Sequence, residues 1–103
     1  MINVLIADDH TIFRAGLRQI LNETPDITVV DEASNGREAL AQLGQAQYDV
    51  ILLDISMPGE SGVEILKQIK NIRPDQVVLI LSMHQEEQYA LRVLRAGASG
   101  YVT

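Results

Sequence analysis

The sequence contains no cysteine among its 103 residues, which excludes a disulfide framework and thiolate chemistry. Positive charge is also scarce: 8 Lys and Arg residues stand against 14 Asp and Glu residues, and the net charge of -6 argues against a nucleic-acid-binding surface. No apolar run approaches the length of a membrane span, and no basic leader precedes the first apolar residues. These absences predict a soluble cytoplasmic domain with no membrane partner.

Hydrophobic residues make up 47% of the chain, which is enough for one domain with a packed core. Short apolar runs at residues 4–7, 50–53 and 77–81 predict strands that are buried on both faces. The β-branched run at residues 27–30 predicts another strand, and a fifth strand is expected to begin at residue 99.

Apolar residues at helical spacing predict helices between these strands. We expect the first helix to have Thr11 as its N-cap and to end before Pro25. Its apolar face is predicted to contain Phe13, Gly16, Leu17, Ile20 and Leu21, with Arg14, Arg18 and Gln19 on the other side. A second helix is expected to end near Gly44. A third, opened by a capping box of Ser61 and Glu64, is expected to stop before Pro74 with Val63, Leu66, Ile69 and Ile72 inward. A fourth is predicted to carry Tyr89, Val93 and Ala96 and to end at Gly97.

The strict alternation of strands and helices predicts an α/β fold with a parallel sheet between helices. The first, third and fourth strands are the continuously apolar ones, so we expect them at the centre of the sheet. The second strand contains Thr28 and leads into Asp31, which suits an edge position. These features predict a doubly wound five-stranded sheet in the order 2-1-3-4-5.

Polar residues follow three of these strands: Asp8 and Asp9 the first, Asp54 the third and Ser82 the fourth. Taken singly, these residues have structural interpretations, because acids and hydroxyls often cap helices or form turns. In the predicted order, however, the strand ends meet at one edge of the sheet. Crowded carboxylates and a hydroxyl group there indicate a Mg²⁺ or Mn²⁺ site for phosphoryl transfer.

Four motifs in this order resemble the receiver domain of bacterial two-component response regulators. They are Asp8-Asp9, the segment Leu-Leu-Asp-Ile-Ser-Met-Pro-Gly around Asp54, Ser82, and Gly-Ala-Ser-Gly-Tyr at residues 97–101. The segments Ala-Asp-Asp-His and Gly-Ala-Ser-Gly-Tyr-Val-Thr are similar to the NarL/FixJ (LuxR-type) branch. The resemblance implies a flavodoxin-like (CheY-like) fold and a signalling module, not an enzyme.

The same resemblance implies that Asp54 is the phosphoacceptor, which takes a phosphoryl group from a sensor histidine kinase. Asp8, Asp9, Asp54 and the backbone carbonyl of Ser56 would hold Mg²⁺ or Mn²⁺.

Two further residues receive roles from the resemblance. Ser82 would donate a hydrogen bond to the phosphoryl group, and Tyr101 would be the aromatic switch. From their place two positions beyond Asp54 and Ser82, we expect Ser56 and His84 to tune the rate of dephosphorylation.

The receiver family has a Lys directly after the position of Thr103, then a turn and a fifth helix, and the printed sequence ends before them. We therefore expect residues 1–103 to be a receiver domain truncated within or just after its fifth strand and lacking the final helix. A sheet face left open in this way predicts a homo-oligomer, most simply a dimer. DNA binding is expected only through an absent C-terminal helix-turn-helix domain.

Three other functions are alternatives to that of a receiver. An aspartyl-phosphate phosphatase of the haloacid dehalogenase kind would have a second Asp two residues after its nucleophile, where this chain has Ser56. A nucleotide-binding module would need a glycine-rich fingerprint or a Walker lysine, and neither is present. A pseudo-receiver, which keeps the fold for protein contacts alone, remains an alternative for a chain without the family's Lys.

Overall fold

The computed structural model describes residues 1–55, 62–81 and 94–102. The described elements are β1 (Ile2–Ala7), α1 (Thr11–Glu23), β2 (Ile27–Ala33), α2 (Gly36–Leu43), β3 (Val50–Asp54), α3 (Gly62–Ile72), β4 (Val77–Leu81) and β5 (Gly100–Val102). Strands and helices alternate as far as β4, as the sequence predicted, and the fourth helix, expected around Tyr89 and Val93, falls largely outside the described residues. None of the described helices has the length and the apolar character that crossing a membrane requires.

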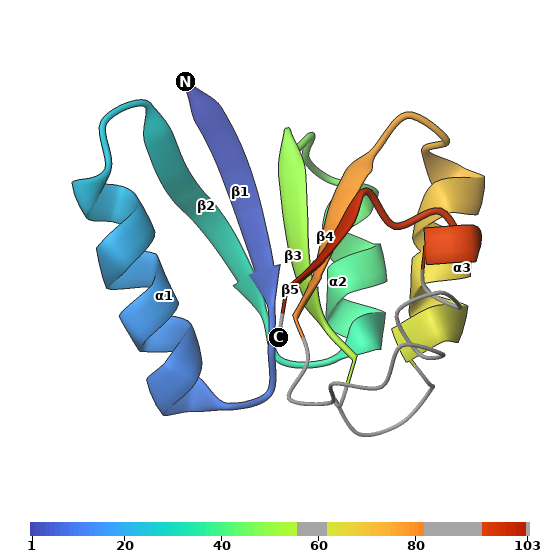
Figure 1. Ribbon diagram of the computed structural model, residues 1–103, viewed down its shortest axis with the longest axis horizontal. Coiled ribbons are helices and arrows are strands. Elements are labelled where there is room, and N and C mark those ends of the chain that lie inside the picture. The colour runs from blue at the N-terminus through green and yellow to red at the C-terminus, as the bar shows by residue number, and fades with distance from the viewer. Residues whose placement is uncertain (56–61, 82–93, 103) are drawn as a thin grey trace.

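The five strands form one parallel sheet in the order β2-β1-β3-β4-β5, which confirms the predicted topology. The three continuously apolar strands, β1, β3 and β4, occupy its centre, as predicted. Figure 1 shows α1 on one side of the sheet and α2 and α3 on the other.

The core has two parts, one on each face of the sheet. The larger part packs α2 and α3 against alternate residues of the central strands, among them Leu5, Ile51, Leu53, Val78 and Ile80. The smaller part contains Val4, Ile6 and Val29, with Leu17 and Leu21 of α1 packed against it. Alternation along each strand therefore divides the apolar residues between the two helical layers.

Helix α1 differs from its prediction in the face that it turns toward the sheet. Leu17 and Leu21 pack on the core as expected, but Phe13 is 50% exposed and Ile20 is 63% exposed. Arg14, which was placed on the outer face, reaches Glu32 of β2 with its Nε 3.0 Å from the carboxylate. The prediction was wrong here because helical spacing defines an apolar stripe and not which part of that stripe a neighbouring strand covers.

The start of α1 also differs from the prediction. The helix begins at Thr11, and its N-cap is His10, whose side chain makes no capping hydrogen bond. Thr11 is therefore not the cap. Asp8 is not the cap either, because its Oδ1 accepts the backbone N–H of His10 at 2.8 Å and so closes a turn before the helix.

Strand β2 is longer than the predicted run of residues 27–30 and continues to Ala33. The register against β1 shifts between Val4 and Leu5, so that Val29 and Asp31 face consecutive residues of β1 and Val30 is extra. Charged residues are tolerated at this edge because they have partners: the hydroxyl of Tyr48 donates to Asp31 at 2.6 Å.

The remaining helix predictions concern α2, α3 and the turn before β5. Helix α2 ends at Leu43 with Gly44 as its C-cap, as predicted. Val63, Leu66 and Ile69 of α3 are buried, whereas Ile72 is 55% exposed, so its predicted inward position was wrong. Gly97 has φ +111, a conformation that favours glycine and agrees with its predicted capping role. Ser61 lies outside the described residues.

Candidate functional site

The register of the sheet brings the predicted acids together. In the parallel pair of β1 and β3, Ala7 lies opposite Leu53, so the next residues along the two strands are Asp8 and Asp54. The backbone N–H of Asp8 still donates to Ala33 of β2 at 2.9 Å, which fixes the chain at the point where β1 ends. Neighbouring strands thus deliver both carboxylates to the same edge of the sheet.

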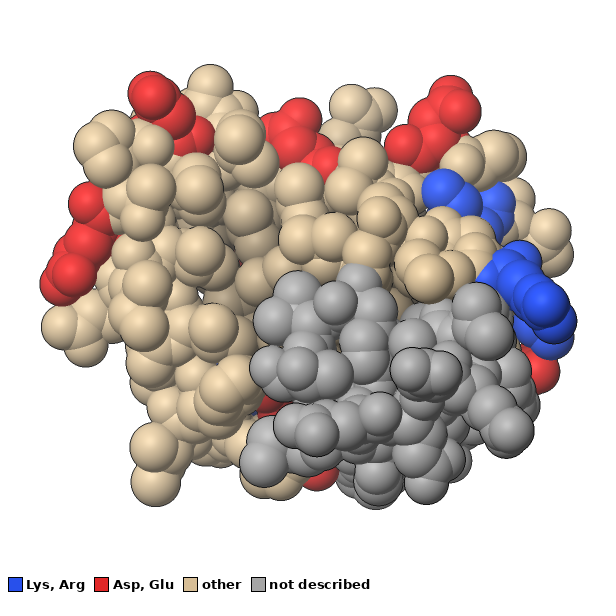
Figure 2. All heavy atoms as spheres, in the orientation of Figure 1, with Lys and Arg blue, Asp and Glu red and all other residues tan. Residues whose placement is uncertain are grey.

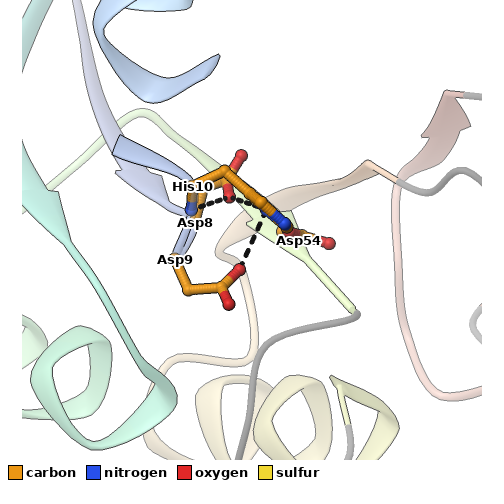
Figure 3. Close-up of side chains that lie close together, drawn as sticks. All are labelled: Asp8, Asp9, His10 and Asp54. Atoms are coloured by element: carbon orange, nitrogen blue, oxygen red, sulfur yellow. Dashed lines mark hydrogen bonds and ion pairs between the residues drawn. The ribbon is translucent and has the colours of Figure 1, made fainter. Parts of the chain in front are cut away.

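Asp8, Asp9, His10 and Asp54 form the acid cluster, and one ligand atom from each lies within 4.8 Å of the others. Asp8 and Asp54 are buried, whereas Asp9 is half-buried and His10 is exposed. Nδ1 of His10 lies 3.1 Å from Asp8 Oδ1, 3.0 Å from Asp9 Oδ1 and 3.6 Å from Asp54 Oδ2. Figure 3 shows the three carboxylates gathered around this imidazole.

The electrostatics of the cluster are those of crowded like charges. Burial raises the pKa of Asp8, and the neighbouring Asp54 raises it further, while hydrogen bonds from His10 act in the opposite direction. The pKa of His10 is raised, chiefly by its hydrogen bond to Asp8 and by the charge of Asp9. Negative charge at this edge of the sheet therefore favours a cation, and the imidazole supplies part of that compensation.

An arginine from α1 supports the loop that carries the acids. The guanidinium group of Arg14 donates to the backbone carbonyl of Asp8 and also to Glu32 of β2. Arg18, one turn later, donates to the other oxygen of Glu32 at 2.8 Å. Arg14 thus ties the end of β1 to the first helix and the edge strand, and it places a permanent positive charge behind the cluster.

The residues of the cluster fit a divalent cation. Oδ1 of Asp9 is buried, and within the part of the chain that the structure describes it makes no hydrogen bond and has an ion pair at 3.0 Å with Nδ1 of His10, which exists only when the ring is protonated. A buried oxygen in that situation is costly unless an ion or a solvent molecule compensates it. Carboxylate oxygens are the ligands that Mg²⁺ and Mn²⁺ prefer, so Asp8, Asp9 and Asp54 could hold either ion.

The other predicted site residues are described only in part. Ser56, Ser82 and His84 lie outside the described residues. Leu81, which ends the described part of β4, is the register partner of Asp54. Tyr101 has its backbone in β5 opposite Ile80, but its side chain also lies outside the described part.

Sequence reasoning missed the positions of two side chains near the site. His10 was quoted only as part of a motif, although it directly follows the two acids at the end of a strand. Arg14 was assigned to the outer face of its helix. The first could have been found from its neighbours in the sequence, whereas the second depends on how α1 lies across β2.

The family described as the response regulator receiver domain matches residues 4–103. Oxygen regulatory protein NreC of Staphylococcus carnosus is 46% identical over 100 residues, which are 96% of this chain and 46% of that protein. Response regulator UvrY of Escherichia coli is 42% identical over 103 residues, all of this chain and 47% of that protein. The chain thus spans about half the length of these curated relatives.

Solved structures show the same fold. A two-component response regulator of the LuxR family from Aurantimonas superposes on the whole chain with a TM-score of 0.96 at 35% identity, and the match covers 74% of that structure. The signal receiver domain of a NarL response regulator from Mycobacterium tuberculosis gives a TM-score of 0.90 at 33% identity, over 97% of this chain and 81% of that one.

Proposed function

The chain belongs to the response regulator receiver domain family, and from that membership we propose that Asp54 is its phosphoacceptor. The observation that carries the proposal is the position of this carboxylate: it ends the central strand β3 and lies in a cluster with Asp8 and Asp9. A receiver of the NarL/FixJ type takes part in two-component signalling, and the curated relatives include transcriptional regulators.

The proposed reaction is phosphoryl transfer from a phosphohistidine of a sensor histidine kinase. A carboxylate oxygen of Asp54 attacks phosphorus, the phosphorus–nitrogen bond breaks, and the electron pair returns to the imidazole of the kinase. The product is an acyl phosphate on Asp54. This chain has little covalent work to do beyond presenting the carboxylate, because the transfer is catalysed chiefly by positioning and by compensation of charge.

We assign the divalent cation of this reaction, Mg²⁺ or Mn²⁺, to Asp8, Asp9 and Asp54. When bound, it would neutralise charge on the transferred group. Asp8 and Asp9 share their origin at the end of β1, and Arg14 holds the backbone between them and the helix. A related receiver of this fold, TrrA of Thermotoga maritima, has been solved in complex with Mg²⁺ and beryllofluoride at 33% identity and a TM-score of 0.88, which supports the assignment.

Family resemblance completes the proposal with groups that lie outside the described part, which belong to Ser56, Ser82 and the side chain of Tyr101. Ser82 would donate a hydrogen bond to a phosphoryl oxygen, the carbonyl of Ser56 would join the metal ligands, and Tyr101 would respond to the movement of Ser82. Phosphorylation would then act on a DNA-binding output domain. The relative RcsB from Salmonella enterica, of whose chain the match covers 52%, has been solved bound to the promoter rprA.

Phosphorylation with a small phosphodonor tests the central assignment. The chain, and a version extended through the family's Lys and final helix, are treated with acetyl phosphate and Mg²⁺ and weighed by intact mass spectrometry. One phosphoryl group is expected on the extended wild type and none on Asp54→Asn. Asp75→Asn, an exposed acid in the turn between α3 and β4, is the matched control and should behave as wild type.

Two results would change the proposal. A phosphorylated species that persists in Asp54→Asn would place the phosphoacceptor elsewhere. An extended protein that takes up neither phosphate nor beryllofluoride would favour the pseudo-receiver, a domain that retains the fold for protein contacts only.

We also propose that the chain self-associates through the sheet face that carries α1. This face has partly exposed apolar residues both on the helix, at Phe13 and Ile20, and on the strand β4, at Val77. In Figure 2 the surface on the side of α1 is mostly uncharged, whereas Lys and Arg gather on the side of α3. A two-fold dimer closes such a face on itself. Light scattering over a concentration series should give a dimer, and a clean monomer at high concentration would refute it.

A further inference from the structure

We propose that Glu32, in the edge strand β2, is a positioning residue for the cation site. It acts through Arg14 of α1, which holds the peptide group that joins Asp8 to Asp9. The inference rests on the proposed receiver function, because it concerns the cation site assigned there. It adds a residue that lies outside the acid cluster and belongs to a different strand.

The backbone of Asp8 is held on both sides. Its N–H donates to the carbonyl of Ala33 in β2 at 2.9 Å, and its own carbonyl accepts a hydrogen bond from Nη1 of Arg14. This carbonyl and the N–H of Asp9 belong to one planar peptide group. Arg14 therefore fixes the orientation of the group from which the chain continues into Asp9, and the direction of the Asp9 side chain depends on that orientation.

Glu32 in turn holds the guanidinium group of Arg14. Helix α1 lies beside β2 (Figure 1), and Nε of Arg14 is 3.0 Å from Glu32 Oε1 while Nη1 contacts the Asp8 carbonyl. Because the guanidinium group is planar and rigid, a partner that fixes one of its nitrogens also fixes the direction of the others. The second oxygen of Glu32 accepts from Arg18 at 2.8 Å, so both oxygens of this carboxylate are engaged by α1.

Burial distinguishes the contact of Glu32 with Arg14 from an ordinary surface ion pair. The side chains of Arg14 and Glu32 are 17% and 26% exposed, whereas that of Arg18 is 55% exposed. Exposed ion pairs are weakened by water and contribute little. The contact with Arg14 is therefore the one that can transmit the position of Glu32 to the site, and the contact with Arg18 should matter less.

Positioning and simple electrostatics predict opposite effects of removing Arg14. A positive charge near the acids repels a divalent cation, so the loss of that charge alone would tighten Mg²⁺ binding. Loss of the support for the Asp8–Asp9 peptide group would instead weaken binding, because Mg²⁺ demands nearly ideal ligand geometry. We expect the second effect to dominate and the dissociation constant for Mg²⁺ to rise about 10-fold in Arg14→Gln.

Mg²⁺ titrations followed by NMR of the folded chain test this in four variants. Glu32→Ala should weaken Mg²⁺ binding about as much as Arg14→Gln, and the double variant should be no weaker than Arg14→Gln alone, because Glu32 acts through Arg14. Arg18→Gln is the matched control: it removes the same charge from the same carboxylate and should change the affinity by less than about twofold. Unchanged or tighter binding in Arg14→Gln would overturn the inference. So would a Glu32→Ala effect that is equally large in the absence of Arg14.

A second measurement needs no metal. The residual dipolar coupling of the Asp9 N–H reports the orientation of the peptide group, and it should change in Arg14→Gln and Glu32→Ala but not in Arg18→Gln. An unchanged coupling in Glu32→Ala would overturn the inference even where Arg14→Gln does not fold. Failure of the wild type to bind Mg²⁺ would instead count against the proposed receiver function, so the two failures are distinguishable.

Discussion

Gly62 lies where the end of β3 and the start of α3 meet, and replacing it with Ala should destabilise the protein. A Cβ added at Gly62 would lie 2.5 Å from Cβ, 2.6 Å from Cα and 2.6 Å from Cγ2 of Ile55. Ordinary contacts between such carbons begin near 3.4 Å, and one of the three atoms belongs to the backbone. Side-chain rotation therefore cannot relieve the clash, and either the helix or the segment after Asp54 has to move.

The expected magnitude is a balance of two effects. Overpacking of this kind costs about 1–3 kcal/mol. Replacing Gly by Ala in a helix contributes about 0.5–1 kcal/mol of stability, and less at the first helical position, where Gly62 lies. The net change should be a loss of about 1–2 kcal/mol. For a domain of this size each kcal/mol shifts the Tm by about 4–8 °C.

Gly16 provides the matched control within the same chain. It lies in the interior of α1, and a Cβ added there would meet no atom within 4 Å. Gly16→Ala should therefore stabilise the protein by about 0.5–1 kcal/mol, because the helix-propensity gain is not opposed by a clash. The two variants make the same chemical change with opposite expected signs.

Urea denaturation and calorimetry measure both variants, with equal m-values as the check that the denatured state is unchanged. Because Ile55 directly follows Asp54, Gly62→Ala should also weaken Mg²⁺ binding, whereas Gly16→Ala should leave it unchanged. If Gly62→Ala were as stable as Gly16→Ala, the close packing of Gly62 of α3 against Ile55 would be incorrect.

Three further predictions concern other parts of the molecule. Burial raises the pKa of Tyr48 above its usual value near 10, so the folded state keeps a proton that the unfolded chain loses. The contribution of Tyr48 to the free energy of unfolding should stay constant below about pH 10 and decrease above it. In Tyr48→Phe, the free energy of unfolding should therefore decrease less at alkaline pH than in the wild type. The same substitution removes the hydrogen bond to Asp31 and should lower the free energy of unfolding at neutral pH by about 1–2 kcal/mol, as measured by urea denaturation. An unchanged urea midpoint would contradict this prediction. Arg14→Ala should lower the free energy of unfolding by about 1–3 kcal/mol. Arg14→Lys should lower it by nearly as much, because a single ammonium group cannot replace both guanidinium contacts. Full rescue by Lys would show that the charge alone matters. In the phosphorylated protein, substitutions at Ser56 and His84 should change the half-life of the acyl phosphate but not the affinity for Mg²⁺, and unchanged half-lives in both would place the path of attacking water elsewhere.

The sequence by itself determined the order of the elements and the edge of the sheet at which the site lies. Unbroken apolar runs require burial on both faces, so β1, β3 and β4 had to be central, and alternation with helices required parallel pairing. Once β1 and β3 are neighbours, Asp8 and Asp54 must be close, because parallel strands end at the same edge. These conclusions follow from local patterns and the connectivity of the chain.

Only the tertiary structure decided how side chains share the space around that edge. Periodicity could not show that Arg14 faces β2 while Phe13 and Ile20 remain exposed, since the rotation of a helix about its axis depends on the neighbour that it meets. The continuation of β2 beyond residue 30 to Ala33 depends on partners of Asp31 and Glu32 that are distant in the sequence. The placement of the His10 imidazole among three carboxylates likewise required the loop after β1 and the end of β3 to be present together, because distances between side chains from different strands are set by packing and not by spacing along the chain.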